Sequence, residues 1–598
     1  MRGLWRLKPY FIAYRVPLIA GMVLFFFSRL FEALVPYFMA LGIDRIATHL
    51  KAGGTVGSGS AQLLAPAAGI VIAVIARYCV VTAARILVRS TGIRISYDLR
   101  QRLYDALQHQ GLKFFNKFTI GDMMTRAVAD ISLVQRLFAM GVIMLVITVY
   151  APIVGFGFML AMSPKLTLLI LPPLPFVYLY AKYATRHLFQ SSRDVQDRLS
   201  DLGALVQENL SGIRTIQAMV QEPHEIRRFQ TQNQAYADAF YEQARVNSLM
   251  TAFLPGTVAL CTIAILGYGG KLVLDGEMSL GQFTAFFAYV SMVVQPFRSA
   301  GMVINMFQRA AVATDRLYEV FDLEPEISDV PSGKTPHDIV GRIDFRHLTF
   351  RYPDTTTDVL RAVSLSIAQG ETITIMGRVG SGKTTLLKLL VRLLDPPTGT
   401  ILIDGHDVRE YPLAQLRDQV GMVPQDPFLF GEPLKNNITY DDPQRGIASI
   451  WAAADAADLR DTIEEFPEQM ETVVGERGVT LSGGQKQRTT LARGLIRGAP
   501  VLILDDCFSA VDTETEEHIL SELQRLRGDK TTILVSHRVS TARHSNRIVI
   551  LEDGRITEIG SHEELLAAGG FYAELERIQR EGATAEDRER GVFATSDA

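Results

Sequence analysis

The sequence predicts a membrane-embedded all-α domain of six transmembrane helices, followed by a soluble α/β domain. Three observations support this fold class: six long apolar segments before residue 321, β-branched runs alternating with helical patterns after residue 341, and a glycine-rich loop between a strand and a helix. The chain has 598 residues. One hydrophobic core cannot hold that length, because single cores stop growing at about 250–300 residues.

The composition changes along the chain and divides it into four predicted segments. We expect a transmembrane domain over residues 1–321, a linker over 322–340, an α/β domain over 341–580 and a polar tail over 581–598. The linker is recognised by prolines and a glycine among polar residues, a composition typical of a connection between domains.

Six segments are long and apolar enough to cross a membrane, which takes about 20 residues of helix. They cover residues 16–43, 63–88, 140–162, 166–184, 248–273 and 280–308. The first segment follows a basic N-terminus, as a signal peptide would. It is too long for the apolar core of a signal peptide, however, and no small-residue cleavage site follows it. We therefore expect it to be the first transmembrane helix.

Lysine and arginine are concentrated in the long connections after the second and the fourth span, while the opposite connections are short and poor in charge. One of those short connections is the Gly/Ser-rich segment 53–60. Positive residues accumulate on the cytoplasmic side of a membrane. Both basic connections and both termini are therefore predicted to be cytoplasmic. The basic connections also have the periodicity of amphipathic helix, which predicts spans that continue as helices beyond the bilayer.

Two pairs of polar residues lie inside predicted spans: Arg29 with Glu32, and Gln295 with Arg298. Charged groups inside a membrane are costly and often functional. Arg29 and Glu32 are three residues apart, so they can form a local ion pair that fixes helix packing. They can equally line a translocation pathway, and the sequence leaves both interpretations open.

The composition also argues against two classes of site. The net charge of −4 lacks the strong positive charge of a nucleic-acid binder, so we expect no nucleic-acid partner. Cys79, Cys261 and Cys507 are far apart in the sequence, which suggests neither a disulfide framework nor a zinc site. All three are expected to be buried apolar side chains.

The glycine-rich loop has the pattern of a phosphate-binding P-loop. A strand pattern over residues 371–376 leads into the loop, and a leucine-rich helix follows it. Glycines allow backbone N–H groups to converge on phosphates at the positive end of a helix. In such a loop Lys383 reaches the β- and γ-phosphates and Thr384 ligates Mg²⁺. The phosphate-binding residues are predicted to be Gly377, Arg378, Val379, Gly380, Ser381, Gly382, Lys383, Thr384 and Thr385.

A second buried strand is predicted over the apolar residues 501–504, and it delivers Asp505 and Asp506 to its end, beside the P-loop. A carboxylate in that place suits Mg²⁺. Asp505 is therefore the predicted carboxylate ligand.

A five-residue motif lies between the P-loop and this strand: Leu481, Ser482, Gly483, Gly484 and Gln485. It resembles the signature of the ATP-binding-cassette (ABC) family, which contacts the ATP bound by a partner cassette. The resemblance implies ATP and Mg²⁺ as the cofactors of this domain.

Other motifs of the same family follow in order. Tyr352 resembles the aromatic residue that stacks on adenine, and Gln425 resembles the Q-loop glutamine, which contacts ATP-bound Mg²⁺. Residues 475–478 resemble the loop that touches the coupling helices, and residues 509–512, ending in Asp512, match the D-loop. His537 matches the switch histidine that contacts the γ-phosphate.

The resemblance covers nearly the whole chain. Residues 115–122 and 208–214 resemble the two coupling helices of type IV exporters, in which the spans precede the cassette in one chain. The resemblance implies a half-transporter in the cytoplasmic membrane that exports a small hydrophobic or amphipathic substrate, whether drug, lipid or peptide. ATP binding would close the cassettes and turn the spans outward, and hydrolysis would reset them. With one P-loop and six spans, the working unit is expected to be a dimer.

One residue departs from the family pattern. The family places a glutamate where this chain has Asp506, whose carboxylate is displaced by about 1 Å, enough to cost about a hundredfold in rate. Binding should survive while hydrolysis weakens, as in the weak half of heterodimeric exporters whose partner supplies the glutamate. Two alternatives stay open: a homodimer in which Asp506 is the working base, and an ATP-gated regulator or channel on the same scaffold.

Overall fold

The structure is a computed structural model that describes residues 2–51, 60–329, 337–353, 355–475, 478 and 480–581. The centre of the predicted linker, most of the Gly/Ser-rich connection, Glu476, Arg477 and nearly all of the polar tail lie outside these residues. The chain separates into two compact units. One consists of Met1–His109 with Phe118–Leu323, and the other of Gln110–Lys117 with Glu324–Ala598.

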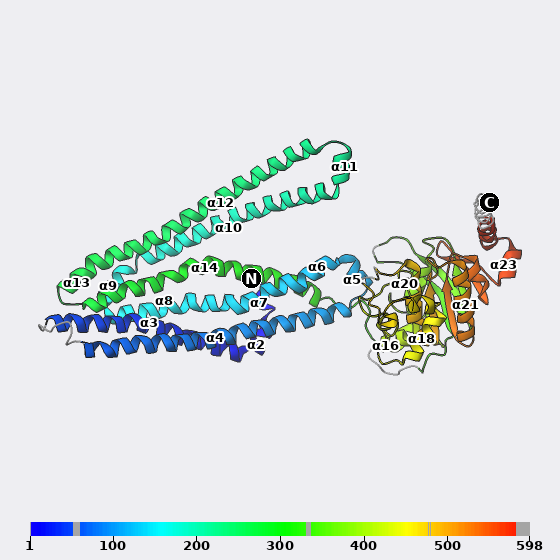
Figure 1. The fold of residues 1–598 in the computed structure, drawn as a ribbon, viewed down its shortest axis with the longest axis horizontal. Coiled ribbons are helices and arrows are strands. Elements are labelled where there is room, and N and C mark those ends of the chain that lie inside the picture. The colour runs from blue at the N-terminus through cyan, green and yellow to red at the C-terminus, as the bar shows by residue number, and fades with distance from the viewer. Residues whose placement is uncertain are drawn as a thin grey trace. The chain divides into compact units, whose positions relative to one another are not determined.

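The first unit is helical, and each of the six predicted spans falls on helix (Figure 1). The helices that carry them are α3 (Arg15–Lys51), α4 (Ser60–Gln108), α8 (Val142–Met162), α9 (Pro164–Ile170) with α10 (Pro173–Ser211), α12 (Glu222–Ala264) with η3 (Ile265–Gly269) and α13 (Gly270–Leu274), and α14 (Leu280–Phe321). Shorter helices complete the unit: α1 (Arg2–Trp5), α2 (Lys8–Ala13), α6 (Ile120–Thr125), η1 (Arg126–Asp130), α7 (Ile131–Arg136), η2 (Leu137–Gly141) and α11 (Ile213–Ala218).

Among the described residues, three helical stretches are long and apolar enough to cross a membrane: Arg15–Lys51, Leu63–Gln108 and Ile120–Met162. Shorter apolar stretches, Ala259–Leu274 and Leu280–Val294, fall in the fifth and sixth predicted spans. Most side chains of residues 173–185 lie outside the described set, so the fourth span stays a prediction. Helices α4 and α10 run on through the amphipathic segments, which confirms the predicted helix there.

Helices α3 and α14 are joined at the start of α14. Asp44 Oδ1 accepts a hydrogen bond from Gly281 N at 2.7 Å, and Asp44 Oδ2 accepts one from Ser279 Oγ at 2.6 Å. A helix N-terminus leaves N–H groups unsatisfied, and Asp44 supplies an acceptor from a neighbouring helix. The approach is close, because a Cβ at Gly281 would lie 2.0 Å from the Ala40 carbonyl oxygen. Only glycine fits this position.

The predicted local pair between Arg29 and Glu32 is present in α3. Glu32 Oε1 also accepts from Arg77 Nη2 of α4 at 2.9 Å, so the pair joins two helices as well as satisfying itself. A role in a translocation pathway stays a prediction. The side chains of Gln295 and Arg298 lie outside the described residues.

A second ionic network joins the residues before α8 to the end of α14. Arg126 is buried, and its guanidinium donates to Asp122 Oδ2 at 3.0 Å and to Glu319 Oε2 at 2.9 Å. Arg316 of α14 donates to the other Asp122 oxygen at 2.7 Å. The four side chains tie α6 and η1 to α14. A buried guanidinium is tolerated here because its charge is paired with carboxylates.

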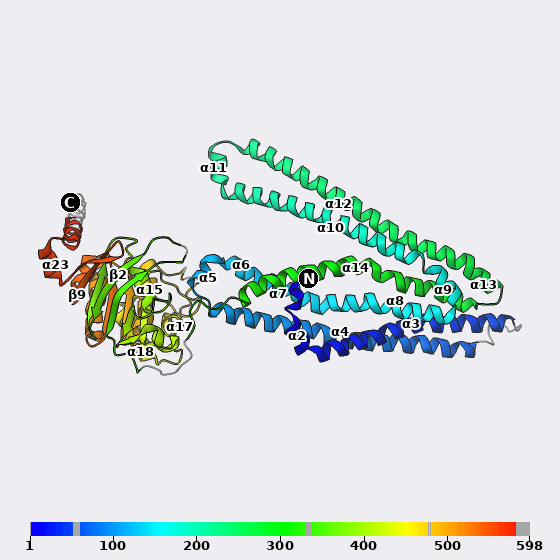
Figure 2. The same cartoon turned by 180° about the vertical axis from the view of Figure 1, so that it is seen from behind.

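Helices α10 and α12 pack side by side as a hairpin whose turn is α11 (Figures 1 and 2). In both views the α11 end stands away from α3, α4, α8 and α14 of the same unit. None of the residues of α11, all of which the structure describes, is buried. The second predicted coupling helix, residues 208–214, therefore falls at the exposed end of this hairpin.

One prediction about the cysteines is wrong. Cys261 and Cys507 are buried as expected, whereas Cys79 of α4 is exposed. It shares that helix with other exposed apolar side chains, including Ile75 and Tyr78. Lipid tails are as apolar as leucine, so a membrane helix can leave an apolar face uncovered by protein.

The second unit contains two sheets. A four-stranded sheet has the order β2-β1-β4-β5, and a six-stranded sheet has the order β10-β9-β3-β8-β7-β6. The strands are β1 (Ile343–Phe350), β2 (Leu360–Ile367), β3 (Thr372–Met376), β4 (Ile401–Ile403), β5 (His406–Asp407), β6 (Val420–Val423), β7 (Val501–Asp505), β8 (Thr531–Val535), β9 (Arg547–Glu552) and β10 (Arg555–Gly560). Strands β6 to β9 and β3 run parallel, and β10 pairs antiparallel with β9.

The second unit also contains helices before, between and after these strands. They are α5 (Leu112–Lys117), α15 (Lys383–Leu390), η4 (Val408–Glu410), α16 (Leu413–Gln419), α17 (Leu434–Ile438), α18 (Ile447–Ala456), α19 (Arg460–Glu464), η5 (Gln469–Glu471), α20 (Gly483–Ile496), α21 (Thr513–Arg527), α22 (Val539–Arg543), α23 (His562–Ala568) and the helical residues 571–581. All five residues of β7 and all five of β8 are buried, as expected for central parallel strands covered on both faces.

Replacing Asp44 should test the α3–α14 contact. Asp44→Ala removes the acceptor for Gly281 N and for the Ser279 hydroxyl, and we expect it to destabilise the protein by about 2 kcal/mol. The thermal unfolding midpoint of the detergent-purified chain should fall. Asp275→Ala, at an exposed turn before α14, is the matched control and should leave the midpoint unchanged. Equal midpoints for both variants would contradict the proposed stabilising role of Asp44.

Candidate nucleotide-binding site

The topology of the six-stranded sheet brings the predicted catalytic motifs to one edge. The P-loop follows β3, His537 follows β8 and Asp505 ends β7; these strands are neighbours in the order β3-β8-β7. Gln425 follows β6, which pairs with β7. The pairings are all parallel, so the carboxyl ends of the four strands lie together. Ligands in open α/β sheets bind beyond those ends.

The P-loop backbone requires glycine at two positions. Gly377 has φ +145°, and a Cβ there would lie 2.0 Å from the Leu551 carbonyl oxygen. Gly382 has φ +103° at the N-terminus of α15, and a Cβ would lie 2.8 Å from Leu360 Cδ2. Positive φ and close approach both exclude other residues. The glycines therefore set the path of the loop into the helix.

Lys383 is the first residue of α15 and is buried. Its ammonium donates to the carbonyl oxygens of Gly377 at 2.8 Å and Arg378 at 2.9 Å, so the loop wraps around it. Burial lowers the pKa of Lys383, and the nearby charges of Asp505 and Asp506 oppose that shift. An ammonium in this position can exchange its carbonyl acceptors for phosphate oxygens.

The donor set around Thr384 fits Mg²⁺. Thr384 Oγ1 donates to Asp505 Oδ1 at 3.4 Å, which brings a hydroxyl and a carboxylate together, and Mg²⁺ prefers such oxygen ligands. Asp505 is 2% exposed, and burial raises the pKa of its carboxyl group. The buried Ser381 Oγ has no hydrogen-bond partner within the part of the chain that the structure describes. That orphaned hydroxyl is suited to a phosphate oxygen.

Asp506 lies at the same edge in an unusual backbone conformation. Its φ is +48°, in the left-handed region that aspartate tolerates better than most residues. Gln425 Nε2 donates to Asp506 Oδ2 at 3.2 Å, so the Q-loop glutamine contacts the carboxylate directly. Burial raises the pKa of Asp506, while His537 and Lys383 act in the opposite direction.

His537 is half-buried beside the same charges. Burial lowers the pKa of its imidazole, and the positive charge of Lys383 lowers it further. Both effects favour the neutral ring, which can still donate one hydrogen bond to a phosphate oxygen. The sheet thus brings Lys383, Asp505, Asp506, Gln425 and His537 together, as the sequence predicted for one site.

Tyr352 lies at the rim of this region. Its hydroxyl shares a hydrogen bond with Thr385 Oγ1 at 3.1 Å, which joins the predicted adenine-stacking residue to the residue after the P-loop. The ring packs edge-on against Phe350 and lines a cavity of about 460 Å³ together with Lys388. A second cavity, of about 380 Å³, is lined by Thr384, Gln425 and Asp505.

The signature motif begins α20. Ser482 caps the helix by accepting from Gln485 N, and Gln485 completes a capping box by accepting from Ser482 N. Gly484 lies against the D-loop, where a Cβ would be 2.8 Å from the Ala510 carbonyl oxygen. Gly483 has more room, since its Cβ would lie 3.6 Å from Ala510 Cβ.

Two residues that the sequence analysis did not single out contact the D-loop. Gln487 of α20 is buried; it donates to Ser509 Oγ at 2.8 Å and accepts from Ala510 N at 2.9 Å. Arg538, next to the switch histidine, donates to the carbonyl oxygen of Val511 at 3.0 Å and pairs with buried Glu516. Both residues lie beside predicted motifs, and that position is the signal by which the sequence could have identified them. Their contacts join segments that are distant in the chain, so the sequence alone does not show them.

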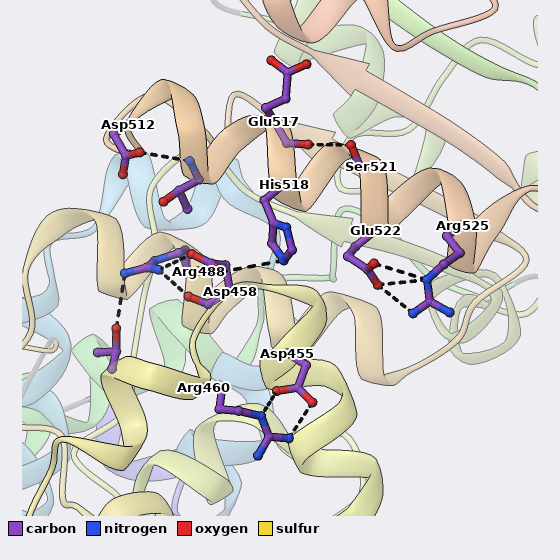
Figure 3. Close-up of polar contacts among 12 residues, drawn as sticks. Asp455, Asp458, Arg460, Arg488, Asp512, Glu517, His518, Ser521, Glu522 and Arg525 are labelled. Carbon is purple, nitrogen blue, oxygen red and sulfur yellow. Dashed lines mark hydrogen bonds and ion pairs between the residues drawn. The ribbon is translucent and has the colours of Figure 1, made fainter.

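Figure 3 shows that residues of α20 and α21 both face Asp458, which lies between α18 and α19. Arg488 of α20 contacts Asp458 at 3.1 Å, and His518 of α21 faces the same carboxylate at 4.0 Å. Asp512 accepts from Thr515 N at 3.0 Å and caps α21, which also lowers the pKa of Asp512. The D-loop aspartate is thus a helix cap in this chain as well as a predicted site residue.

Comparison with known proteins identifies both halves of the chain. Residues 18–297 match the family of the ABC transporter transmembrane region, and residues 360–509 match the ABC transporter family. An ATP-dependent lipid A-core flippase of Syntrophus aciditrophicus is 36% identical over 495 residues, which cover 83% of this chain and 82% of the flippase. This chain belongs to the ABC transporter family.

Other comparisons agree. A relative in Staphylococcus aureus with the provisional name of a multidrug export ATP-binding/permease protein is 31% identical over 97% of this ABC transporter and 99% of its own length. The structure of a bacterial Atm1-family ABC exporter with ATP bound has a TM-score of 0.74 and 24% identity, covering 96% of this chain and 98% of that one. That likeness shows the fold alone. The family makes this chain a multi-pass membrane protein whose ATPase domain couples ATP hydrolysis to transport.

Replacing Lys383 should test the P-loop of this ABC transporter. Lys383→Ala removes the ammonium that would contact the β- and γ-phosphates, so this site should lose nucleotide binding. The measurement is photolabelling of the chain by an azido-ATP analogue. Lys530→Ala is the matched control, because Lys530 also donates to a backbone carbonyl, that of Gly498 at 2.9 Å, away from the P-loop. Labelling of the Lys383 variant at wild-type affinity would refute the assignment.

Proposed function

We propose that this ABC transporter is one half of a dimeric exporter in the cytoplasmic membrane, with both termini in the cytoplasm, and that it moves a hydrophobic or amphipathic substrate outward. The observation that carries this proposal is the convergence of Lys383, Asp505, Asp506, Gln425 and His537 at one sheet edge, in a chain whose first half is membrane helix. The basic connections between spans support the orientation.

Two observations support a dimer. The sequence has one P-loop and one signature motif, and in this family each ATP lies between the P-loop of one chain and the signature of the other. The α10–α12 hairpin also leaves apolar side chains uncovered, including Leu199, Val206 and Leu210. Exposed apolar groups on a helical arm suit contact with a second exporter half.

The substrate class rests on the relatives and on the chemistry of the spans. One relative is named for flipping lipid A-core and another for exporting multiple drugs. Both names describe amphipathic or apolar molecules. Within the spans, Glu32 pairs with Arg29 and with Arg77, and these charges would meet a polar group of such a molecule. A lipid, a drug or a hydrophobic peptide fits this description.

In the proposed hydrolysis, the residues at the sheet edge have separate roles. Lys383 binds the β- and γ-phosphates, Tyr352 stacks on adenine, and Asp506 accepts a proton from the attacking water. His537 donates a hydrogen bond to the γ-phosphate, and Gln425 moves between the Asp506 carboxylate and the nucleotide. Mg²⁺, held by Thr384, Asp505 and Gln425, would neutralise charge on the phosphate oxygens.

Asp506 makes this site the weaker of two in our proposal. Its side chain is one methylene shorter than the family's glutamate, and in this chain Gln425 Nε2 donates to its carboxylate. We therefore favour a heterodimer whose other half carries glutamate after its Mg²⁺ aspartate. The homodimer with Asp506 as a working base is the competing assembly.

Transport in sealed vesicles tests the proposal as a whole. Inside-out vesicles that contain the complex should accumulate a fluorescent lipid or dye against its gradient when ATP is present. An ATP-gated regulator or channel on the same scaffold would let the dye equilibrate without accumulation. Equilibration alone would therefore reject the pump and favour the gate.

A substitution in the signature tests the cross-chain pairing. Gly483→Asp places a charge where the partner's ATP would lie, and the available space at Gly483 means that the fold should tolerate it. We expect ATPase activity of the purified complex to fall by at least tenfold while azido-ATP labelling of this chain persists. Gly446→Asp, at an open helix start, is the control. Full activity of the Gly483 variant would exclude the pairing.

Substitution of Asp506 tests the weak-site proposal. If the carboxylate is misplaced, Asp506→Ala should lower the ATPase rate of the complex only modestly, and Asp506→Glu should keep or raise it. A loss of a hundredfold or more, about 2.7 kcal/mol of barrier, would make Asp506 a true catalytic base and favour the homodimer.

The backbone at Asp506 needs its own control. Alanine at positive φ carries a conformational cost of about 1 kcal/mol, which could lower activity by destabilising the fold. Asp553 has φ +46° in an exposed turn, close to the +48° of Asp506. Asp553→Ala therefore measures the cost of the conformation alone, and the activity of the Asp506 variants is compared with it.

A further inference from the structure

The last described helix of the chain, residues 571–581, packs beside the nucleotide-binding edge. Tyr572 is fully buried in an apolar cluster with Met376 at the end of β3 and Val539 at the start of α22. Phe571 lies under the guanidinium of Arg378, 5.6 Å from Cζ to the ring centroid. Because Met376 and Arg378 stand on either side of Gly377, this helix packs against side chains at the start of the P-loop.

Gln579 of the same helix contacts the switch loop with both atoms of its amide. Its Nε2 donates to the carbonyl oxygen of His537 at 2.7 Å, and its Oε1 accepts from Val539 N at 2.9 Å. Val539 is the first residue of α22, and the N-cap residue Arg538 makes no side-chain cap hydrogen bond. Gln579 thus supplies the missing cap from a distant part of the chain.

The two hydrogen bonds restrict the backbone on either side of Arg538. A second contact of the helix, between Glu576 and Arg543 at 3.0 Å, holds the other end of α22. The carbonyl of His537 is therefore fixed from one side by Gln579, and the direction of the imidazole depends on that backbone. A misplacement of about 1 Å is enough to weaken a contact to substrate.

We propose that Gln579 is a positioning residue for His537, and that the helix 571–581 thereby sets the preference of this site for ATP over ADP. The argument rests on the proposed contact between His537 and the γ-phosphate, which ADP lacks. Loss of the Gln579 amide should weaken that contact alone, because Lys383 and the P-loop glycines are untouched. The effect should appear as a lower affinity for a triphosphate with an unchanged affinity for a diphosphate.

The test measures binding to the full-length complex in nanodiscs, with the imido analogue of ATP and with ADP, each with Mg²⁺. Each nucleotide competes with azido-ATP photolabelling of this chain, so the measured binding is assigned to this chain and not to its partner. Gln579→Ala should lower the affinity for the imido analogue by about three- to tenfold, the effect of losing one or two hydrogen bonds, and leave ADP unchanged. Gln579→Met keeps the side-chain volume without the amide and should give the same result, so a loss seen in both variants comes from the missing amide and not from unpacking of the helix. Arg577→Ala, at an exposed position two residues earlier, should change neither affinity.

A double variant asks whether Gln579 acts through His537. In a His537→Ala background, Gln579→Met should cause no further loss, because coupled residues are not additive. A further loss of equal size, a parallel loss of ADP affinity, or no change in either affinity would each overturn the proposal. Failure of the wild-type chain to bind the imido analogue would instead reject the proposed function, so the two failures are distinguishable.

Discussion

The parallel register of four neighbouring strands is the constraint on which the site depends. Because β3, β8, β7 and β6 run in the same direction and lie side by side, the loops after them meet at one edge of the sheet. The P-loop, His537, the two aspartates and Gln425 come from segments of the chain that are far apart. Their proximity follows from the pairing, and the burial of every residue of β7 and β8 keeps these two strands in the interior of the sheet.

Burial at this edge has electrostatic consequences that no single residue explains. Asp505 and Asp506 are adjacent acidic groups whose pKa values burial raises, and burial lowers the pKa of Lys383, which lies near both. Each charge is tolerated because the others are near, so removal of one should alter the ionisation of the rest. The contact between Gln425 and Asp506 adds a neutral donor to this set, which satisfies one carboxylate oxygen without adding charge.

Much of the fold could be predicted from local pattern. The spacing of glycines, the strand before them and the leucine-rich helix after them correspond to β3, the P-loop and α15, and the apolar run before Asp505 is β7. The contacts made by Gln487 and Gln579 could not be predicted, because each joins residues that are distant in sequence and carries no motif. The exposure of Cys79 was mispredicted for a related reason: composition does not tell whether an apolar side chain meets protein or lipid.

The bridge made by Gln487 ties the signature helix to the D-loop. Its amide holds Ser509 and Ala510 to α20, only a few residues after Asp506, while Ser482 lies five residues before Gln487 at the start of that helix. A displacement of the signature motif would therefore reach the sheet edge that carries Asp506 through a short, hydrogen-bonded path. Thermodynamic linkage makes such coupling reciprocal. In the proposed dimer, nucleotide binding at one site would change the binding affinity of the other site by the same free energy in both directions.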